Sequence, residues 1–394
     1  MSRRLDPGLK SLVVLVSAIV LCDTIFYSAI TPLLPTYADE HGISKTGAGI
    51  LEATYAAGTL IGAIPAGVLA ARVGVRATVL LGLALLGISS FVFGVADSIL
   101  LLDLARFMQG VGGACSWAGA LAWLVALSPA ERRGELIGTA MGAAIVGALL
   151  GPALGALAEA IGTASVFSLA AVLASGLAVA ALRIPAPERS GAADPRSLGR
   201  AALDPRVAGG MALTALPGVL FAAIGVLGPL RLDDLGAGSL AIGATFIAAS
   251  TLEAISSPIV GRVSDRLGRL VPIRAGLLCA TPLLLLIPHP ETAWIVAALI
   301  VFVSPAIGAS WAPAMALLAD GIEARGVNVA MGFSLVNAAW GIGHVTGGAG
   351  GGALADAAGD VTAFAALAVL CLGVALVLLR MRSRETRGRE VLAS

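Results

Sequence analysis

Three charged side chains stand inside long apolar stretches, and each could carry or bind charge within a membrane. They are Asp23, Arg106 and Glu253. A carboxylic acid in hydrocarbon keeps its proton unless a cation takes the proton's place, because a low dielectric disfavours the ionised form. Asp23 therefore predicts one site for which a proton and a cationic molecule compete. The simpler alternative is a protonated Asp23 that only hydrogen-bonds to a neighbouring helix.

The other two charges suggest further roles. A buried arginine in lipid is costly unless it is paired, so Arg106 is predicted to be functional, with a structural clamp to backbone carbonyls or to Asp103 as the alternative. Glu253 lies two helical turns before Gly261, about 12 Å into the membrane. It is a candidate second proton carrier.

Two more titratable side chains are ambiguous. Glu52 lies close enough to the end of its apolar run to be solvated. His344 could titrate near neutral pH, and it could equally be a structural histidine.

Apolar runs must position these side chains. The 394-residue chain is 58% hydrophobic and 12% charged, which no water-soluble core requires. Runs that can cross a hydrocarbon layer need roughly 20 residues each. We predict an all-α membrane protein with twelve transmembrane helices at residues 11–36, 47–71, 77–97, 99–127, 134–159, 163–183, 207–231, 238–261, 270–288, 292–319, 327–354 and 361–381.

The positive charges orient these spans. Of the 25 Lys and Arg residues, all but Lys45, Arg106 and Arg231 fall on one side of the membrane when the runs are threaded through it. Because cytoplasmic loops collect Lys and Arg, this side is predicted to be cytoplasmic, with both termini there, in a cell membrane. The charge is spread along one face and gathers in no groove, so nucleic acid is not an expected partner.

The spans fall into two pseudo-symmetric halves. The Pro-rich polar stretch 184–206 is predicted to be a cytoplasmic linker between a six-helix bundle at 1–183 and a second bundle at 207–394. Ser116-Trp117-Ala118 recurs as Ser310-Trp311-Ala312, and the segment 67–74 recurs at 261–268. A duplicated bundle is typical of transporters that bind substrate between the halves near the bilayer midplane.

The motifs in these spans resemble the major facilitator superfamily, and within it the twelve-span proton-coupled drug antiporters and vesicular amine transporters. The resemblance covers nearly the whole chain. It implies conformational-switch roles for the residues that match the loop signature after spans 2 and 8, namely Gly67, Arg72, Gly74, Arg76, Gly261, Asp265, Arg266, Gly268 and Arg269. The first copy has Ala71 where the family has an aspartate, so Asp265 is the one carboxylate available for a latch between halves. An orientation signal alone is the alternative for Arg72 and Arg76.

Spans 4 and 5 carry two more signatures. Arg106 and Gln109 match an Arg-x-x-Gln-Gly motif whose arginine is implicated in proton transfer in relatives. Gly147, Gly151, Pro152 and Gly155 match the Gly-x-x-x-Gly-Pro-x-x-Gly pattern associated with antiporters, which implies a conformational role for this span. Glycines at a spacing of four allow another helix to approach closely, and the proline removes a helical hydrogen bond.

Span 1 is similar to that of the vesicular amine transporters, in which the aspartate matching Asp23 contacts the substrate amine. Other acidic positions of those transporters fall on Gly228, Ala309 and Asn337 here, so monoamines are not the expected substrate. The cavity is expected to offer aromatic surface to a bulky cation. The expected substrate-binding residues are Asp23, Tyr27, Gln109, Trp117, Trp311, Asn337 and Trp340. Packing or lipid contact is the alternative for each tryptophan.

These observations predict a proton-coupled antiporter that exports an amphiphilic, cationic small molecule by alternating access. The alternative is a facilitator or proton symporter that takes up a small metabolite. The sequence has no phosphate-binding Gly-x-x-x-x-Gly-Lys-Ser/Thr loop, metal cluster or nucleophile–base pair, so we predict no enzyme, no metal and no cofactor, with the proton gradient as energy source. The expected partners are substrate, protons and the lipid bilayer, and the protein is expected to be a monomer.

Overall fold

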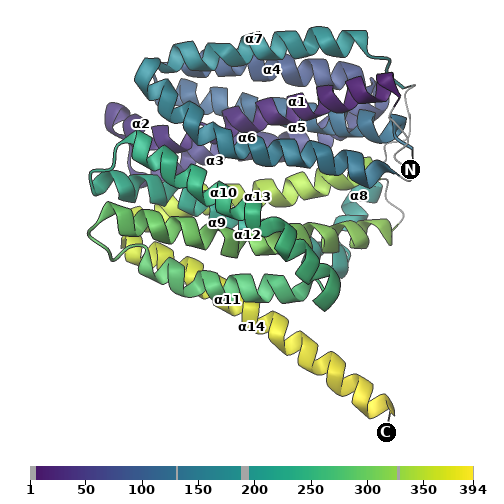
Figure 1. The fold of residues 1–394 in the computed structure, drawn as a ribbon, viewed down its shortest axis with the longest axis vertical. Coiled ribbons are helices and arrows are strands. Elements are labelled where there is room, and N and C mark those ends of the chain that lie inside the picture. The colour runs from purple at the N-terminus through teal and green to yellow at the C-terminus, as the bar shows by residue number, and fades with distance from the viewer. Residues whose placement is uncertain (1–5, 130–131, 188–194, 326–328, 394) are drawn as a thin grey trace.

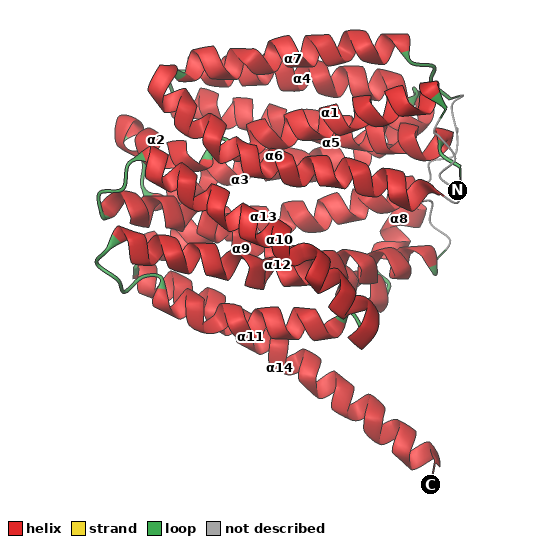
Figure 2. Ribbon diagram, in the orientation of Figure 1, coloured by secondary structure: helices red, strands yellow, loops and turns green. Residues whose placement is uncertain are grey.

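The computed structural model describes residues 6–129, 132–187, 195–325 and 329–393, and these ranges contain helices and no β-strand. Figure 1 shows the helices side by side in one bundle, and Figure 2 shows short loops between them. The helices are α1 (Pro7–Ser28), η1 (Thr31–Leu33), α2 (Leu34–His41), α3 (Lys45–Arg72), α4 (Val75–Val95), α5 (Ile99–Leu127), α6 (Arg133–Ile161), α7 (Thr163–Arg183), α8 (Pro195–Ala202), α9 (Pro205–Asp234), α10 (Ser239–Leu267), α11 (Leu270–Leu286), α12 (Ala293–Glu323), α13 (Val329–Ala358) and α14 (Asp360–Ala393).

Each predicted span has a helix, and the all-helical membrane fold is confirmed. Within the described residues, ten helical segments are long and apolar enough to cross a membrane. The two predicted spans that are not among these ten, 270–288 and 327–354, correspond to the helices α11 and α13. Near Pro32 and Pro35 the first span changes from α1 through the 3-10 turn η1 to α2, because proline donates no backbone hydrogen bond.

The linker contains a short helix that sequence reasoning did not anticipate. Leu198 on α8 is buried in an apolar cluster with Val207, Leu318, Ile322 and Leu335. Asp204 then caps α9 by accepting from the backbone nitrogens of Arg206 and Val207. Residues 188–194 of the predicted linker lie outside the described residues.

The bundle has two unlike faces. One face, here called the arginine face, holds the start of α1, α8 and the helix ends that carry Arg72, Arg132, Arg183 and Arg266. The opposite face holds α2 and the turns at Gly42, Gly162, Gly236 and Gly359. We refer to α1–α7 as the first half and to α9–α14 as the second half.

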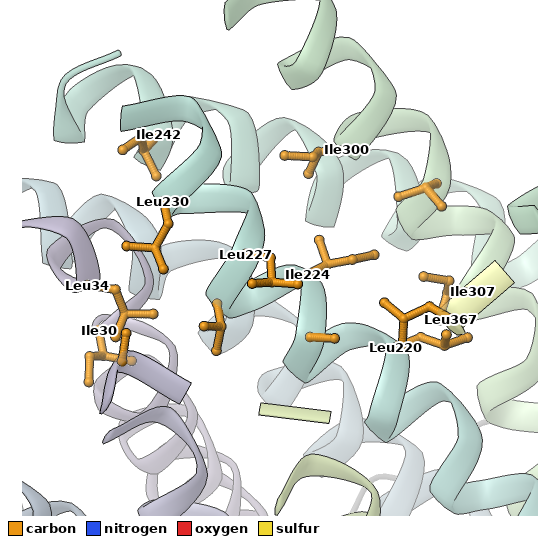
Figure 3. Packing of buried hydrophobic residues seen from close by; sticks show 14 of the residues in the cluster. Ile30, Leu34, Leu220, Ile224, Leu227, Leu230, Ile242, Ile300, Ile307 and Leu367 are labelled. Atoms are coloured by element: carbon orange, nitrogen blue, oxygen red, sulfur yellow. The ribbon is translucent and has the colours of Figure 1, made fainter. Parts of the chain in front are cut away.

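The apolar core joins the halves near the opposite face. Figure 3 shows Ile30 and Leu34 of the first half beside Leu230 of α9, and all three belong to one buried cluster that also includes Ile242 of α10. Toward the arginine face, the buried members of a second cluster come from the first half alone, with Phe333 of α13 packed against it. Burial of shared apolar surface therefore holds the halves together more extensively at the opposite face.

Polar groups reinforce this closure between α3 and α13. The Asp356 carboxylate accepts from the backbone nitrogens of Lys45 and Thr46, at 3.2 and 2.7 Å, so it caps a helix of the other half. Partial loss of solvation raises the pKa of Asp356, but the hydrogen bonds outweigh it and hold that pKa below its ordinary value, at about 2. The Lys45 ammonium also pairs with Asp360 at 2.7 Å. A carboxylate at a helix N-terminus is favoured by the unpaired N–H groups and by the helix dipole.

Glycines set how closely α3 and α13 approach. A Cβ at Gly352 would overlap the carbonyl oxygen of Lys45, and a Cβ at Gly49 would overlap the backbone at Gly348. A Cβ at Gly67, near the arginine face, would lie 3.0 Å from Ser334 Oγ. The two helices are thus in contact along most of their length, and larger side chains at these glycines would push them apart.

We therefore expect Gly352→Ala to destabilise the protein by about 1–3 kcal/mol, because the added methyl group forces the helix backbones apart. Gly350→Ala is the matched control on the same helix, since a Cβ there meets nothing within 4 Å. The midpoint of thermal unfolding in a single detergent compares the two variants. Equal midpoints would show that close approach of α3 and α13 contributes nothing to stability.

Candidate functional site

Asp23 of α1 lies at the centre of the site and is 2% exposed. Its Oδ2 atom accepts two hydrogen bonds, one from the Tyr55 hydroxyl at 2.8 Å and one from Trp117 Nε1 at 2.8 Å. Its Oδ1 atom is buried and has no hydrogen-bond partner among the described residues. One oxygen of the carboxylate is therefore fully engaged, and the other is open to a proton or to a donor that the protein does not supply.

Gly113 of α5 makes room for this arrangement. A Cβ at that position would lie 2.5 Å from the Tyr55 hydroxyl and 3.0 Å from Asp23 Oδ1. Any larger residue would displace the hydroxyl or the carboxylate. The glycines that follow the span-4 arginine motif thus serve the aspartate site as well as helix packing.

Arg106 of α5 has no exposed surface. Its Nη1 donates to Gln109 Oε1 at 3.1 Å, and its Nη2 donates to the backbone carbonyl of Tyr27 at 3.2 Å. The guanidinium carbon lies 5.0 Å from the ring centroid of Tyr55 and 5.7 Å from that of Tyr27, so both rings contribute cation–π contacts. The predicted role of Arg106 in proton transfer stays a prediction.

Glu52 of α3 supplies the opposite charge. Its Oε2 lies 3.8 Å from Arg106 Nη2, and the residue is 7% exposed. The solvated position considered for Glu52 is thus wrong for this structure, because the carboxylate turns inward toward the arginine. Asp103, the alternative partner, forms no ion pair with Arg106 in the described part of the chain.

An aromatic cluster connects this site to the other half. Tyr27 and Tyr55 pack against each other at 4.7 Å between ring centroids, and each lies edge-on to Trp340 of α13, at 5.5 and 6.2 Å. His344 packs on Trp340 at 4.0 Å and is 6% exposed. Of the predicted substrate-binding residues, the structure brings together Asp23, Tyr27, Gln109, Trp117 and Trp340.

Trp311 and Asn337 lie outside this cluster. Both are partly exposed, and the described side chains form no ring contact with Trp311 and no hydrogen bond with the Asn337 amide. Glu253 of α10 lies elsewhere, in the second half. Its carboxylate packs against α12 at Gly308, where an added Cβ would lie 2.7 Å from Glu253 Oε1. No described residue forms an ion pair with its carboxylate.

The loop signature makes contacts within each half. Arg76 donates to the carbonyl of Ile184 and lies 5.7 Å from the Trp123 ring centroid, so it ties the start of the linker to the first half. Arg269 donates to the Ala316 carbonyl at 2.9 Å and pairs with Asp320 of α12.

The remaining signature residues face solvent or form turns. Arg72, Asp265 and Arg266 are exposed, and no described residue pairs with Asp265. Gly74 lies just before α4 and Gly268 just after α10. Their φ angles are +116° and +94°, which a residue with a Cβ rarely adopts. Gly261 has open space around it. A latch through Asp265 remains a prediction, and it would have to form in another conformation.

The span-5 signature joins α6 to α1. Cβ atoms at Gly147, Gly151 and Gly155 would collide with Thr24, Ser28 and the Ala29 carbonyl of α1. The Pro152 carbonyl instead faces the second half, 3.0 Å from the position of a Cβ on Gly243. The glycines thus pack α6 within its own half, and the proline residue lies at the contact between halves.

Sequence reasoning missed Tyr55, and it left open whether Glu52 is solvated. The signal was present: Glu52, Tyr55 and Thr59 recur at i, i+3 and i+7 in an apolar run, which places them on one face of a helix. Thr59 Oγ1 lies 3.2 Å from the Gly110 carbonyl, so this polar face packs on α5.

Known proteins share this sequence pattern and fold. The sequence profile of the Major Facilitator Superfamily matches residues 16–333. The quinolone resistance protein NorA of Staphylococcus aureus is 27% identical over 109 residues, which cover 28% of this chain and 28% of NorA. The MFS-type transporter ppzB of Metarhizium rileyi is 32% identical over 169 residues, 41% of this chain and 35% of ppzB. The chain thus matches about a third or less of the length of these curated relatives.

A solved structure extends the likeness to the fold. The crystal structure of a point mutant of the nucleoside transporter NupG superposes with a TM-score of 0.71, covers 93% of this chain and 98% of its own, and is 12% identical in sequence.

The Arg106–Glu52 pair leads to a test of stability. Glu52→Gln removes the nearest negative charge from a buried guanidinium, and we expect a loss of about 3–5 kcal/mol in the free energy of unfolding. Glu135→Gln is the matched control, because Glu135 pairs with Arg132 at 2.8 Å on an exposed surface, where screening by water leaves little to lose. Thermal unfolding in one detergent measures both. No change for Glu52→Gln would mean that Glu52 carries a proton and does not neutralise Arg106.

Proposed function

We propose, since this chain belongs to the major facilitator superfamily, that it is a secondary active transporter that exchanges protons for an amphiphilic, cationic small molecule by alternating access. The family consists of transporters, and the bundle of apolar helices makes this chain a multi-pass membrane protein. Antiport, export and the cationic substrate are the parts of the proposal that require experiment.

The observation that carries the proposal is the half-satisfied carboxylate of Asp23. Two donors hold Oδ2, and Oδ1 is buried without a partner in the described part of the protein. The nearby cation, Arg106, has its own carboxylate in Glu52. Asp23 is thus left without a fixed counter-charge, and a proton or a substrate cation can each supply it.

Aromatic side chains around Asp23 support a bulky, partly apolar substrate. Trp117 contacts the carboxylate directly, and Tyr27 and Trp340 belong to the aromatic cluster that packs on Tyr55. Aromatic rings attract cations as well as apolar groups. The name of the similar NorA protein refers to quinolone resistance. Export of foreign, amphiphilic molecules from the cell is consistent with that likeness.

The arrangement of the halves supports alternating access. The shared apolar core, the Asp356 cap and the Lys45–Asp360 pair close the opposite face. Since positive loops remain in the cytoplasm, we propose that the arginine face is cytoplasmic and that the opposite face is the extracellular gate in its closed state. Protein in the cell membrane would then load substrate from the inside.

Asp23→Asn tests the exchange site. An amide cannot alternate between a proton and a cation, so ethidium-driven proton movement in proteoliposomes with a trapped pH-sensitive dye should fall to the rate of protein-free liposomes. Asp103→Asn is the matched control, because Asp103 is another acid within a membrane span and its own side chain makes no contact with Asp23 among the described residues. It should exchange protons for ethidium as the unaltered protein does.

Two results would contradict the proposal. Wild-type exchange by Asp23→Asn would remove Asp23 from the mechanism. Proton and probe moving in the same direction would favour the alternative, a symporter for uptake.

Glu253→Gln tests a second proton carrier. Glu253 lies in the second half, away from the aromatic cluster, so its loss should reduce the response of transport to an imposed proton gradient more than it reduces ethidium affinity. Ser256→Ala is the control one turn along α10, since the Ser256 hydroxyl donates only to the Glu253 backbone carbonyl. Affinity in detergent and uptake into liposomes at several gradients separate the two effects. If affinity collapses while coupling survives, Glu253 belongs to the substrate site.

A further inference from the structure

We infer that Tyr55 is the residue that transmits the charge state of Asp23 to the contact between the two halves. This inference rests on the proposed function, because it assumes that Asp23 alternates between ionised and neutralised forms. It assigns a positioning role to a residue on α3 whose hydroxyl lies at the exchange site and whose ring lies at the moving interface.

The hydroxyl end of Tyr55 is bound to the exchange site. It donates to Asp23 Oδ2 at 2.8 Å and lies over the space left by Gly113. A hydrogen bond to an ionised carboxylate is much stronger than one to a protonated or cation-bound carboxyl group. The position of the hydroxyl therefore depends on what Asp23 carries.

The ring end of Tyr55 lies in the interface. Its centroid is 6.2 Å from that of Trp340 at an angle of 88°, and Trp340 belongs to α13 of the second half. One residue further along each helix, a Cβ on Gly341 would lie 3.0 Å from the Ala56 carbonyl. Any shift of the Tyr55 ring thus changes a close contact between α3 and α13.

Trp117 provides an internal contrast. It donates to the same oxygen of Asp23 at the same distance, but the described part of the second half makes no ring contact with it. Removal of either donor alters the equilibrium between the ionised and the neutralised forms of Asp23. Of the two, Tyr55 is the one that reaches the other half.

These contacts give the coupling a direction. Ionised Asp23 holds Tyr55 in its present place and stabilises the conformation seen here, in which α3 and α13 are joined. A proton or a bound cation weakens the bond from the hydroxyl, and the Tyr55–Trp340 contact loosens. Loading of the site should therefore favour rearrangement of the halves.

Other titratable groups surround this link. Those that face it are Arg106 on α5, Glu52 on α3, Cys22 and Tyr27 on α1, and His344 on α13. Near this link, α6 approaches α1 through Gly147 and Gly151, and α7 places Phe167 against Phe26. Among these groups, Glu52 is paired with Arg106, and His344 is the remaining side chain that ordinarily titrates near neutral pH.

The experiment measures distances between spin labels on the arginine face from pH 5 to pH 9 in nanodiscs. Leu127→Cys at the end of α5 and Leu267→Cys at the end of α10 are exposed label sites in the two halves. Cys279, the exposed native cysteine, is replaced by serine. We expect the unaltered protein to shift its distance distribution as Asp23 is protonated.

Tyr55→Phe keeps the ring and removes the hydroxyl. We expect the amplitude of the pH-dependent shift to be lost, while ethidium at a saturating concentration still binds because Asp23 and the rings remain. Trp117→Phe should move the midpoint of the shift and keep its amplitude. Tyr37→Phe is the matched control, since Tyr37 is equally buried and its hydroxyl makes no contact with Asp23. It should behave as the unaltered protein.

The outcomes separate this inference from the proposed function. A full pH-dependent shift in Tyr55→Phe, together with its loss in Asp23→Asn, overturns the role of Tyr55 alone. A shift that survives in Tyr55→Phe and disappears in His344→Gln identifies the histidine as the link and also overturns it. Ethidium binding that is unaffected by Asp23→Asn contradicts the exchange site itself.

Discussion

A fully buried guanidinium is the constraint on which the site depends. Because Arg106 has no exposed surface, its charge depends on partners within the protein. It takes the Tyr27 carbonyl from α1, the Gln109 oxygen from its own helix and the Glu52 carboxylate from α3. Because the Gln109 oxygen faces the arginine, its amide nitrogen must donate elsewhere, and it does so to Ser90 of α4 at 3.0 Å. One charge thereby fixes the relative positions of four helices.

Glycines allow that arrangement to form. Cβ atoms at Gly58 and Gly110 would overlap the backbone carbonyls of Phe107 and Tyr55, so α3 and α5 meet backbone to backbone. This close approach of the two helices places the ring of Tyr55 5.0 Å from Arg106 in the conformation seen here. The first half thus brings the charged groups of the site together. The second half adds Trp340 and His344 on α13, which packs on the same helix α3.

The sequence predicted the spans well and the site in part. Apolar runs and the distribution of arginines determine which segments cross a membrane, so each predicted span has its helix. Asp23 and Arg106 were recognisable because an isolated charge in an apolar run has few structural uses. Which rings surround them depends on the rotation and tilt of each helix, and no local pattern specifies these. Trp311 illustrates the difficulty: it matches Trp117 in the repeat, yet only Trp117 donates a hydrogen bond to Asp23 among the described residues.

The charges at the site also bear on why exchange would be obligatory. Arg106 and Glu52 together are neutral, so the net charge of the proposed site is set by Asp23. A proton or a monovalent cation leaves the site neutral, whereas the empty site carries one negative charge among apolar helices. In the conformation seen here, the ionised carboxylate is the form that holds Tyr55 and Trp117 most tightly. On this argument the empty protein resists rearrangement and both loaded forms permit it, which is the condition that prevents a leak of protons.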